Sequence, residues 1–70
     1  MERFKVGQRV TVNLSEDKVK KLGLSGSPAG QLEVKSEYTN GRKGIFLQPF
    51  GSPNQIGIPE KYYDDIKIVS

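Results

Sequence analysis

The sequence predicts a mainly β domain of five strands, with one short α-helix after the first strand and a 3₁₀ turn before the last. Three observations support this fold class. Apolar and polar residues alternate strictly from Arg9 to Leu14, which is typical of a half-buried strand. Asn40-Gly41, a dipeptide favoured by two-residue hairpin turns, lies between two further alternating runs. Near the end of the chain, Pro59 separates two short apolar runs, and proline cannot continue a strand's hydrogen-bonded ladder.

Length and composition predict one domain over residues 1–70. With 70 residues, of which 34% are apolar and 27% charged, the chain can bury a thin core and is not expected to be disordered. It contains no cysteine and no histidine, which excludes disulfides and thiolate metal sites and removes the commonest general base. No apolar run approaches the ~20 residues of a membrane span, and the first ten residues lack a signal-peptide core. We therefore expect a cytoplasmic protein with no membrane partner.

The segment from Ser15 to Leu24 predicts a helix of two turns with well-matched ends. Ser15 can cap the first turn, acidic residues follow it directly, and lysines occupy the last turn, as the helix dipole favours. Gly23 supplies a left-handed residue after the helix, so that Leu24 can fold back onto its apolar side. Because two turns are not stable alone in water, this helix is expected to pack on a sheet.

A hairpin is predicted around Asn40-Gly41. A two-residue turn there pairs Thr39 with Arg42, and it implies that Val34 faces Leu47 and Leu32 faces Pro49. This register separates the side chains into an apolar face of Leu32, Val34, Ile45 and Leu47, and an opposite face of Glu33, Lys35, Glu37, Phe46 and Gln48.

The remaining chain predicts one more turn, two strands and the 3₁₀ turn. Pro49 ends the hairpin, and Pro53-Asn54 is expected at the corner of the next turn. Residues 55–58 form a short strand with two isoleucines inward, residues 59–65 fit a tight 3₁₀ turn, and residues 66–69 return as the last strand.

This order of elements resembles a five-stranded SH3-like barrel. In that family a 3₁₀ turn joins the fourth and fifth strands, often starting with proline and carrying a tyrosine three residues later, as in Ile58-Pro59-Glu60-Lys61-Tyr62. The resemblance implies a single SH3-like barrel over the chain. Peptide-binding SH3 domains also use a tryptophan and an ALYDY-type run, which this chain lacks. Only Pro59 and Tyr62 carry over, so recognition of polyproline is not expected.

A second resemblance points to nucleic acid. Residues 7–12, GQRVTV, and residues 30–34, GQLEV, look like the glycine-led strands of KOW-type modules in ribosomal and transcription proteins. The helix inserted between them departs from that pattern. The alternative interpretation is structural, because any β protein needs glycine at turns that lead into strands.

Positive charge falls into three clusters, formed by Lys18, Lys20 and Lys21, by Arg42 and Lys43, and by Arg3, Lys5 and Arg9. A net charge of +3 permits a phosphate-binding patch, which would need several of these residues on one side. Acidic residues close to two of the clusters partly cancel their positive charge. A mixed-charge surface with dipole-matched lysines is therefore the favoured interpretation.

Phe46 has two interpretations. Exposed beside Lys35, it could stack on a base or seat an apolar side chain of a partner. Alternatively, the N-terminal segment, with Phe4, covers it and forms a second small core. Tyr38 and Tyr63 likewise fit either a barrel rim or a contact surface. The predicted binding surface consists of Lys35, Arg42, Lys43, Phe46, Phe50 and Tyr62.

Catalysis is not expected. Asp64 and Asp65 are adjacent and would not converge as a carboxylate pair, and residues 25–30, SGSPAG, lack the ending of a phosphate-cradling loop. No carboxylate spacing predicts a metal site, and no cofactor is expected. We expect a non-catalytic binding or adaptor module with a protein partner, suited to an accessory role in a phage or mobile element. A KOW-like module that binds RNA or DNA is the alternative.

Overall fold

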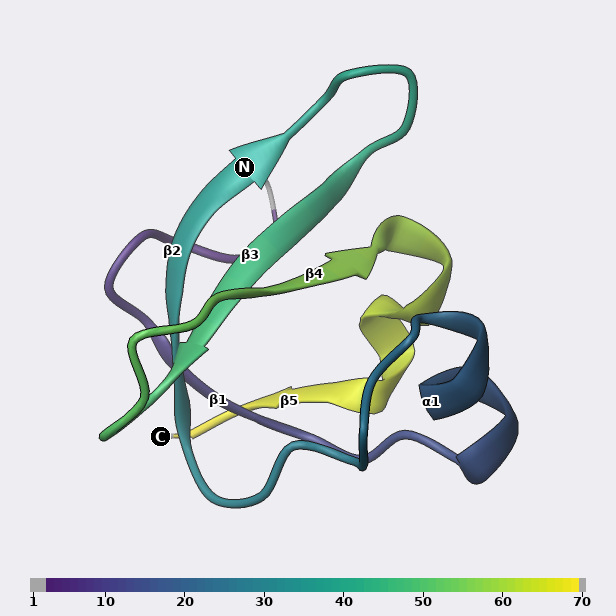
Figure 1. The fold of residues 1–70 in the computed structure, drawn as a ribbon. Coiled ribbons are helices and arrows are strands. Elements are labelled where there is room, and N and C mark those ends of the chain that lie inside the picture. The colour runs from purple at the N-terminus through teal and green to yellow at the C-terminus, as the bar shows by residue number, and fades with distance from the viewer. Residues whose placement is uncertain (1–2, 70) are drawn as a thin grey trace.

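The structure, a computed structural model, describes residues 3–69. Met1, Glu2 and Ser70, which belong to the predicted domain, lie outside the described residues. The elements follow the predicted order (Figure 1): β1 (Arg9–Val12), α1 (Glu16–Lys21), β2 (Leu32–Tyr38), β3 (Gly44–Pro49), β4 (Ile56–Pro59), the 3₁₀ helix η1 (Glu60–Asp65) and β5 (Ile66–Ile68).

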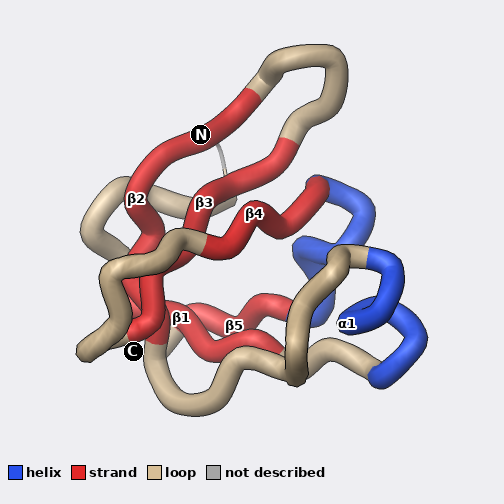
Figure 2. The backbone as a smooth tube through the Cα atoms, in the orientation of Figure 1, coloured by secondary structure: helices blue, strands red, loops and turns tan. Residues whose placement is uncertain are grey.

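The five strands form one antiparallel sheet with the order β4-β3-β2-β1-β5. Strands β4 and β5 are its edges, and η1 connects them at the side of the molecule where α1 also lies (Figure 2). The mainly β class with few helices is therefore confirmed. The sheet is not closed by hydrogen bonds between its described edges, so a closed barrel is not shown. In residues 3–69, no helix is both long and apolar enough to cross a membrane.

The core lies on the inner side of the sheet, where the hairpin's predicted apolar face is confirmed. Leu32, Val34, Ile45 and Leu47 are each 0% exposed. Side chains from every strand, from α1 and from η1 complete the core; besides the hairpin residues these are Phe4, Val10, Val12, Leu14, Val19, Ile58, Tyr62, Tyr63 and Ile66. Phe4 is therefore a core residue, and the interpretation in which it covers Phe46 is wrong.

Both predicted ends of α1 are confirmed. The Ser15 hydroxyl accepts a hydrogen bond from the Lys18 backbone N–H at 3.4 Å. At the other end Gly23 has a φ of 73°, its N–H donates to the Lys20 carbonyl, and the Leu24 N–H donates to the Val19 carbonyl, both at 3.0 Å. These two bonds satisfy carbonyls that the last turn leaves without partners. Leu24 packs against the core, as the fold-back predicted.

The β2–β3 hairpin departs from the predicted register at a β-bulge. The pairs Leu32–Pro49 and Val34–Leu47 form as predicted. Beyond Val34 the register shifts by one residue, and the last pair is Tyr38–Gly44, so residues 39–43 form a five-residue loop. A two-residue type I′ turn needs positive φ at both central residues, yet no described residue other than glycine has one. The predicted Thr39–Arg42 pair is therefore wrong.

The bulge changes which side chains face the core. Beyond it, Glu37 lies opposite Ile45, whose side chain is fully buried, and Ser36 lies opposite Phe46. Because the side-chain period of a strand is two, the extra residue moves Glu37 to the inner side and Tyr38 to the outer side. The sequence prediction placed Glu37 on the outer side beside Lys35, and this placement is wrong.

The β3–β4 turn lies earlier than predicted. The Ser52 N–H donates to the Pro49 carbonyl at 3.2 Å, which places Phe50 and Gly51 at the centre of a tight turn. Gly51 supplies the positive φ of 82° that such a turn requires at its third position. Pro53-Asn54 follows this corner and does not form it.

Candidate functional site

Two aromatic side chains pack together on the outer side of the hairpin. The rings of Tyr38 and Phe46 have centroids 5.0 Å apart and an angle of 48° between their planes. The Tyr38 ring lies directly over Gly44, where a Cβ atom would overlap it. A Cβ at Gly57 on β4 would lie 3.4 Å from Cε1 of Phe46. Gly44 therefore leaves the space that the Tyr38 ring occupies, whereas a Cβ at Gly57 would make an ordinary contact with the Phe46 ring.

Phe50 extends this aromatic surface toward the other end of β3. It is 53% exposed, and the guanidinium carbon of Arg9 lies 5.1 Å from its ring centroid. Phe50 follows β3 in the tight turn, and it lines a pocket with Glu33, Lys35 and Gln48, whose side chains belong to the outer side that also carries Phe46. We call Tyr38, Phe46 and Phe50 the outer aromatic face.

Charged and polar groups line the outer aromatic face at Phe50. A shallow pocket of about 180 Å³ lies between Phe50 and the side chains of Glu33, Lys35 and Gln48. The Lys35 ammonium is 3.2 Å from Oε2 of Glu33. The predicted residue Lys35 thus lies next to Phe50, and its charge is balanced by a neighbouring carboxylate.

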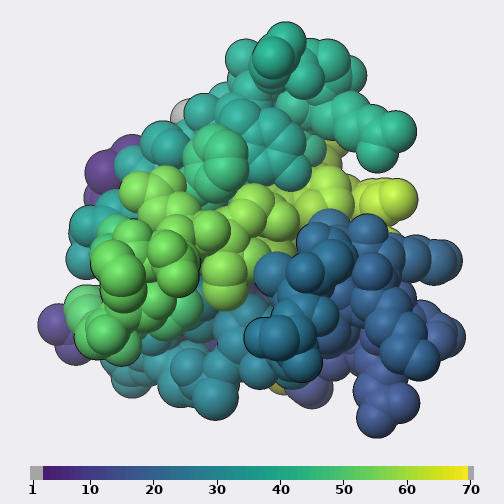
Figure 3. All heavy atoms as spheres, in the orientation of Figure 1, coloured from purple at the N-terminus to yellow at the C-terminus, as the bar shows by residue number. Residues whose placement is uncertain are grey.

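The predicted residues Arg42 and Lys43 lie in the hairpin tip, which projects from the body of the molecule (Figure 3). They line a pocket of about 370 Å³ with Pro59, Glu60 and Lys61, which we call the tip pocket. The Glu60 N–H donates to the Lys43 carbonyl at 2.8 Å, which ties the tip to η1. The tip pocket has three cationic groups and one carboxylate, and Lys43 is 3.7 Å from that carboxylate.

Tyr62 does not belong to an accessible surface. The structure places it in the core at 7% exposure, which corrects the prediction that it lies on the binding surface. In η1 both Tyr62 and Tyr63 turn toward the sheet. The ammonium groups of Lys18 and Lys61 each lie 5.2 Å from the centroid of the Tyr62 ring and cover what remains of it.

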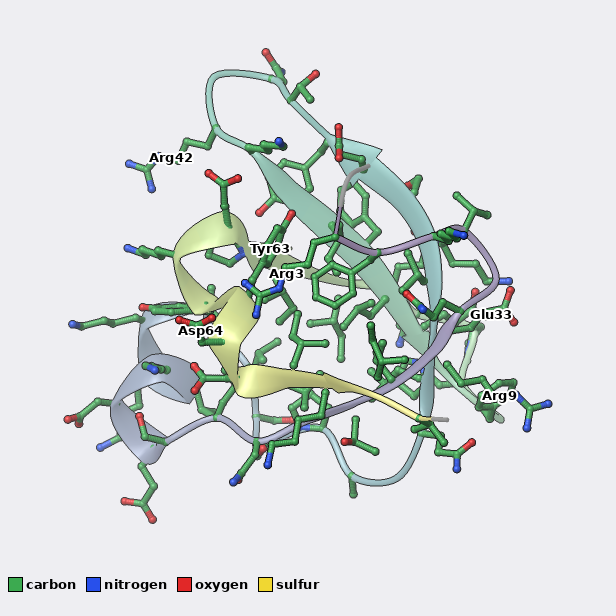
Figure 4. The ribbon with its side chains drawn as sticks, turned by 180° about the vertical axis from the view of Figure 1, so that it is seen from behind. Arg3, Arg9, Glu33, Arg42, Tyr63 and Asp64 are labelled. Carbon is green, nitrogen blue, oxygen red and sulfur yellow. The ribbon has the colours of Figure 1, made fainter. Side chains whose placement is uncertain are left out.

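A third pocket surrounds Tyr63 on the inner side of the hairpin. It has a volume of about 210 Å³, we call it the tyrosine pocket, and its lining residues are Arg3, Phe4, Glu37, Lys43, Ile45, Glu60 and Tyr63. Figure 4 shows Arg3 beside Tyr63 and Asp64, whereas Arg9 and Glu33 lie at the far end of the sheet. The Arg3 guanidinium is 2.9 Å from Oδ1 of Asp64.

The tyrosine pocket was not predicted as a site. Tyr63 was interpreted as a residue of the barrel rim or of a contact surface, but its side chain is only 6% exposed and its ring meets that of Phe4 edge-on at 5.1 Å. Glu37 lines the pocket only because of the bulge in β2. No alternation pattern signals a bulge, so the sequence offered no signal for this group of residues.

Burial and charge both act on the hydroxyls of Tyr38 and Tyr63. Burial raises the pKa of Tyr63, and the carboxylates of Glu37 and Glu60 raise it further, while Arg3 lowers it. Burial also raises the pKa of Tyr38, and Arg42 lowers it. Both tyrosines therefore keep their protons at neutral pH.

Most basic residues near the candidate surfaces have acidic partners. Ion pairs join Arg3 to Asp64, Lys18 to Asp65, Lys35 to Glu33 and Lys43 to Glu60. In the part of the chain that the structure describes, no group of three or more acidic, histidine or cysteine side chains could hold a metal ion. The pattern is that of a mixed-charge surface on which cations and carboxylates alternate.

The chain was compared with protein-family models, with curated proteins and with solved structures. No family model matches it, and neither a curated protein nor a solved structure matches it.

Proposed function

We propose that the chain is a non-catalytic binding module of SH3-like barrel architecture, and that it binds a protein partner through the outer aromatic face. The strand order β4-β3-β2-β1-β5, with a proline-led 3₁₀ helix between the edge strands, supports the barrel assignment. The observation that carries the functional proposal is the half-exposed ring of Phe50, held under Arg9 on the same side as Tyr38 and Phe46.

The composition of this face suits a protein partner. Aromatic residues and arginine are enriched where proteins meet, and they supply most of the binding free energy when a partner covers them. The charges around Phe50 have both signs, since Glu33 balances Lys35. A partner with its own mixed charges matches this rim better than a uniformly anionic nucleic-acid backbone does.

Phe50→Ala is expected to abolish binding of the partner while the domain stays folded. The ring is exposed and makes one cation–π contact, so its loss should change the free energy of unfolding by no more than about 1 kcal/mol. The measurement is capture of proteins from a lysate of the cell that makes the chain, with immobilised wild type and variant compared by mass spectrometry.

Ile68→Ala is the matched control for this capture. Ile68 is also half exposed, at 49%, but it lies on the edge strand β5, which pairs with β1 and not with the hairpin strands. A partner that wild type and Ile68→Ala both retain and Phe50→Ala loses supports the proposal. If Phe50→Ala retains the same proteins as wild type, the outer aromatic face is not the binding surface.

A nucleic-acid partner is the second candidate, and the tip pocket favours it. Arg42, Lys43 and Lys61 converge there against the single carboxylate of Glu60. Convergent cations bind phosphates by releasing counterions, so that affinity falls as the salt concentration rises.

Under this second candidate, the double variant Arg42→Gln/Lys43→Gln is expected to weaken oligonucleotide binding at low salt. Removal of two phosphate contacts should lower the affinity. The number of counterions released on binding, which the salt dependence reports, should fall by about two. Amide NMR spectra titrated with short single- and double-stranded oligonucleotides, at low and moderate salt, provide the measurement. If the wild-type amide signals do not shift with any oligonucleotide, the nucleic-acid candidate is wrong. It is also wrong if the double variant binds oligonucleotides as tightly as wild type.

A further inference from the structure

The guanidinium of Arg9 lies over an exposed ring and has no anionic partner. Its carbon is 5.1 Å from the Phe50 centroid, close enough for a cation–π contact. Glu33 is the cross-strand neighbour of Arg9 in the β1–β2 pair, yet its carboxylate bonds the Lys35 ammonium. Among residues 3–69, the Arg9 side chain makes neither an ion pair nor a hydrogen bond. Its N–H donors are therefore available to a group from outside the chain.

The contact with the ring positions the guanidinium where it stays accessible. Arg9 is exposed, and Phe50 is 53% exposed. Figure 4 shows the Arg9 guanidinium at the margin of the molecule, directed away from the sheet. A guanidinium over an aromatic face uses its flat side for that contact, and the donors at its edge match the two oxygens of a carboxylate. A partner's carboxylate can thus bind Arg9 without displacing a contact of the chain.

The charges left unpaired on the outer side of the strands are positive. In the described strands this side carries one carboxylate, that of Glu33, and three cations, those of Arg9, Lys35 and Lys67. Lys67 lies on β5 opposite Thr11, which shares its side of β1 with Arg9. Lys67 has no ion pair with a residue in the range 3–69. Because Glu33 is paired with Lys35, two cations remain, and the outer side is complementary to carboxylates.

Surroundings of mixed character favour an acidic protein segment over a nucleic-acid backbone at Arg9. Glu33 lies opposite Arg9 and would repel the continuous row of charges that such a backbone brings. A protein segment can place one carboxylate at Arg9 and an uncharged side chain beside Glu33. Phe50 then offers its exposed ring to a neighbouring apolar side chain of the same segment.

We propose that the outer aromatic face binds an acidic segment of its protein partner, in which a carboxylate bonds the Arg9 guanidinium and a neighbouring apolar side chain packs on Phe50. Lys67, on the same side, favours a second carboxylate. This inference rests on the proposed function and names the chemistry of the partner. Phe50 supplies the apolar contact and Arg9 supplies the preference for a carboxylate, so the two parts can fail separately.

The test is an amide NMR titration of the whole chain with the peptide acetyl-Glu-Leu-Glu-Leu-amide. The same peptide with glutamine in place of glutamate keeps the shape and removes the charge. We expect the acidic peptide to shift the signals of Arg9, Gln48 and Phe50, and to bind roughly three- to tenfold more tightly than the glutamine peptide at low salt. This preference should shrink at moderate salt, because exposed charges are screened.

Three variants separate the two contacts, and a fourth is their control. Arg9→Gln should remove most of the preference for the acidic peptide and change the affinity for the glutamine peptide little. Arg9→Lys keeps the charge but lacks the paired donors, so it should restore only part of the preference. Phe50→Ala should weaken the binding of both peptides, since it removes the apolar contact. Lys21→Gln removes an exposed cation from α1 and should bind both peptides as wild type does.

Four results would overturn the proposal. Three of them are equal binding of the two peptides by wild type, an unchanged preference in Arg9→Gln, and absence of shifts at millimolar peptide. The fourth is tighter binding of a thymidine hexanucleotide than of the acidic peptide at the same salt concentration, which would replace the acidic segment with nucleic acid. If wild type binds the two peptides equally and Phe50→Ala weakens both, the outer aromatic face stands and only the carboxylate is wrong.

Discussion

Replacing Phe4 with alanine is expected to lower the free energy of unfolding by about 3–5 kcal/mol. The ring is 2% exposed and packs edge-on against Tyr63, with 5.1 Å between the centroids. A domain of this length has a total stability of about 4–10 kcal/mol, so the variant should be partly or largely unfolded at room temperature. Urea unfolding followed by circular dichroism measures the change.

Phe50→Ala is the matched control for this loss. It removes the same side chain from a position that is 53% exposed, and it should change the stability by no more than about 1 kcal/mol. Similar losses in the two variants would contradict the core position of Phe4. A small loss in Phe4→Ala would revive the alternative in which the N-terminal segment lies over Phe46.

Features of the fold that depend on residues close together in the sequence were predicted correctly. The cap at Ser15 and the left-handed Gly23 act within one helical turn, so residue type and spacing determine them directly. The inner positions of Val34 and Leu47 follow from strand alternation counted near the base of the hairpin. In each case the local pattern and the final packing agree.

The hairpin tip was not predicted, because its geometry depends on packing across the sheet. Asn40-Gly41 favours a two-residue turn when it is considered alone. In the folded chain the ring of Tyr38 lies over Gly44 and against Phe46, and the Glu60 N–H bonds the carbonyl of Lys43. The one-residue bulge in β2 is compatible with both contacts, whereas the predicted register would direct Tyr38 inward.

The candidate sites were predicted only in part for the same reason. Residue type pointed to Arg42, Lys43 and Phe50, and the structure places all three at the surface. Tyr62 was assigned by a short motif, which does not report how far a side chain is buried. The tyrosine pocket joins Arg3, the bulged hairpin and η1, which are far apart in the sequence, so only the folded chain reveals it.

Tyr63 is expected to respond very differently to two substitutions. Tyr63→Ala removes a buried ring and should cost about 3–5 kcal/mol of stability. Tyr63→Phe keeps the ring and removes a hydroxyl that has no partner, so the stability should stay equal or rise by about 1 kcal/mol. Urea unfolding of both variants near neutral pH is the measurement. A loss above about 1 kcal/mol in Tyr63→Phe would mean that the hydroxyl is hydrogen-bonded in solution.

The same hydroxyl should make the domain less stable at alkaline pH. The pKa of Tyr63 in the folded state is raised above its ordinary value of 10.0 by burial and by the carboxylates of Glu37 and Glu60. The unfolded chain therefore loses this proton first as the pH rises past 10.0, and the free energy of unfolding falls until the folded state also deprotonates. Below that range both states are protonated, and Tyr63 contributes no pH dependence.

Tyr63→Phe should reduce this alkaline decline, as measured by urea unfolding from about pH 9 to about pH 11.5. Tyr38 retains its own raised pKa in that variant, so a smaller decline should remain, and Tyr38→Phe serves as the comparison. Because wild type and Tyr63→Phe differ in one hydroxyl alone, the difference between their declines isolates the contribution of that hydroxyl. An identical decline in the two proteins would show that Tyr63 ionises equally easily in the folded and unfolded states, which is incompatible with a buried hydroxyl facing two carboxylates.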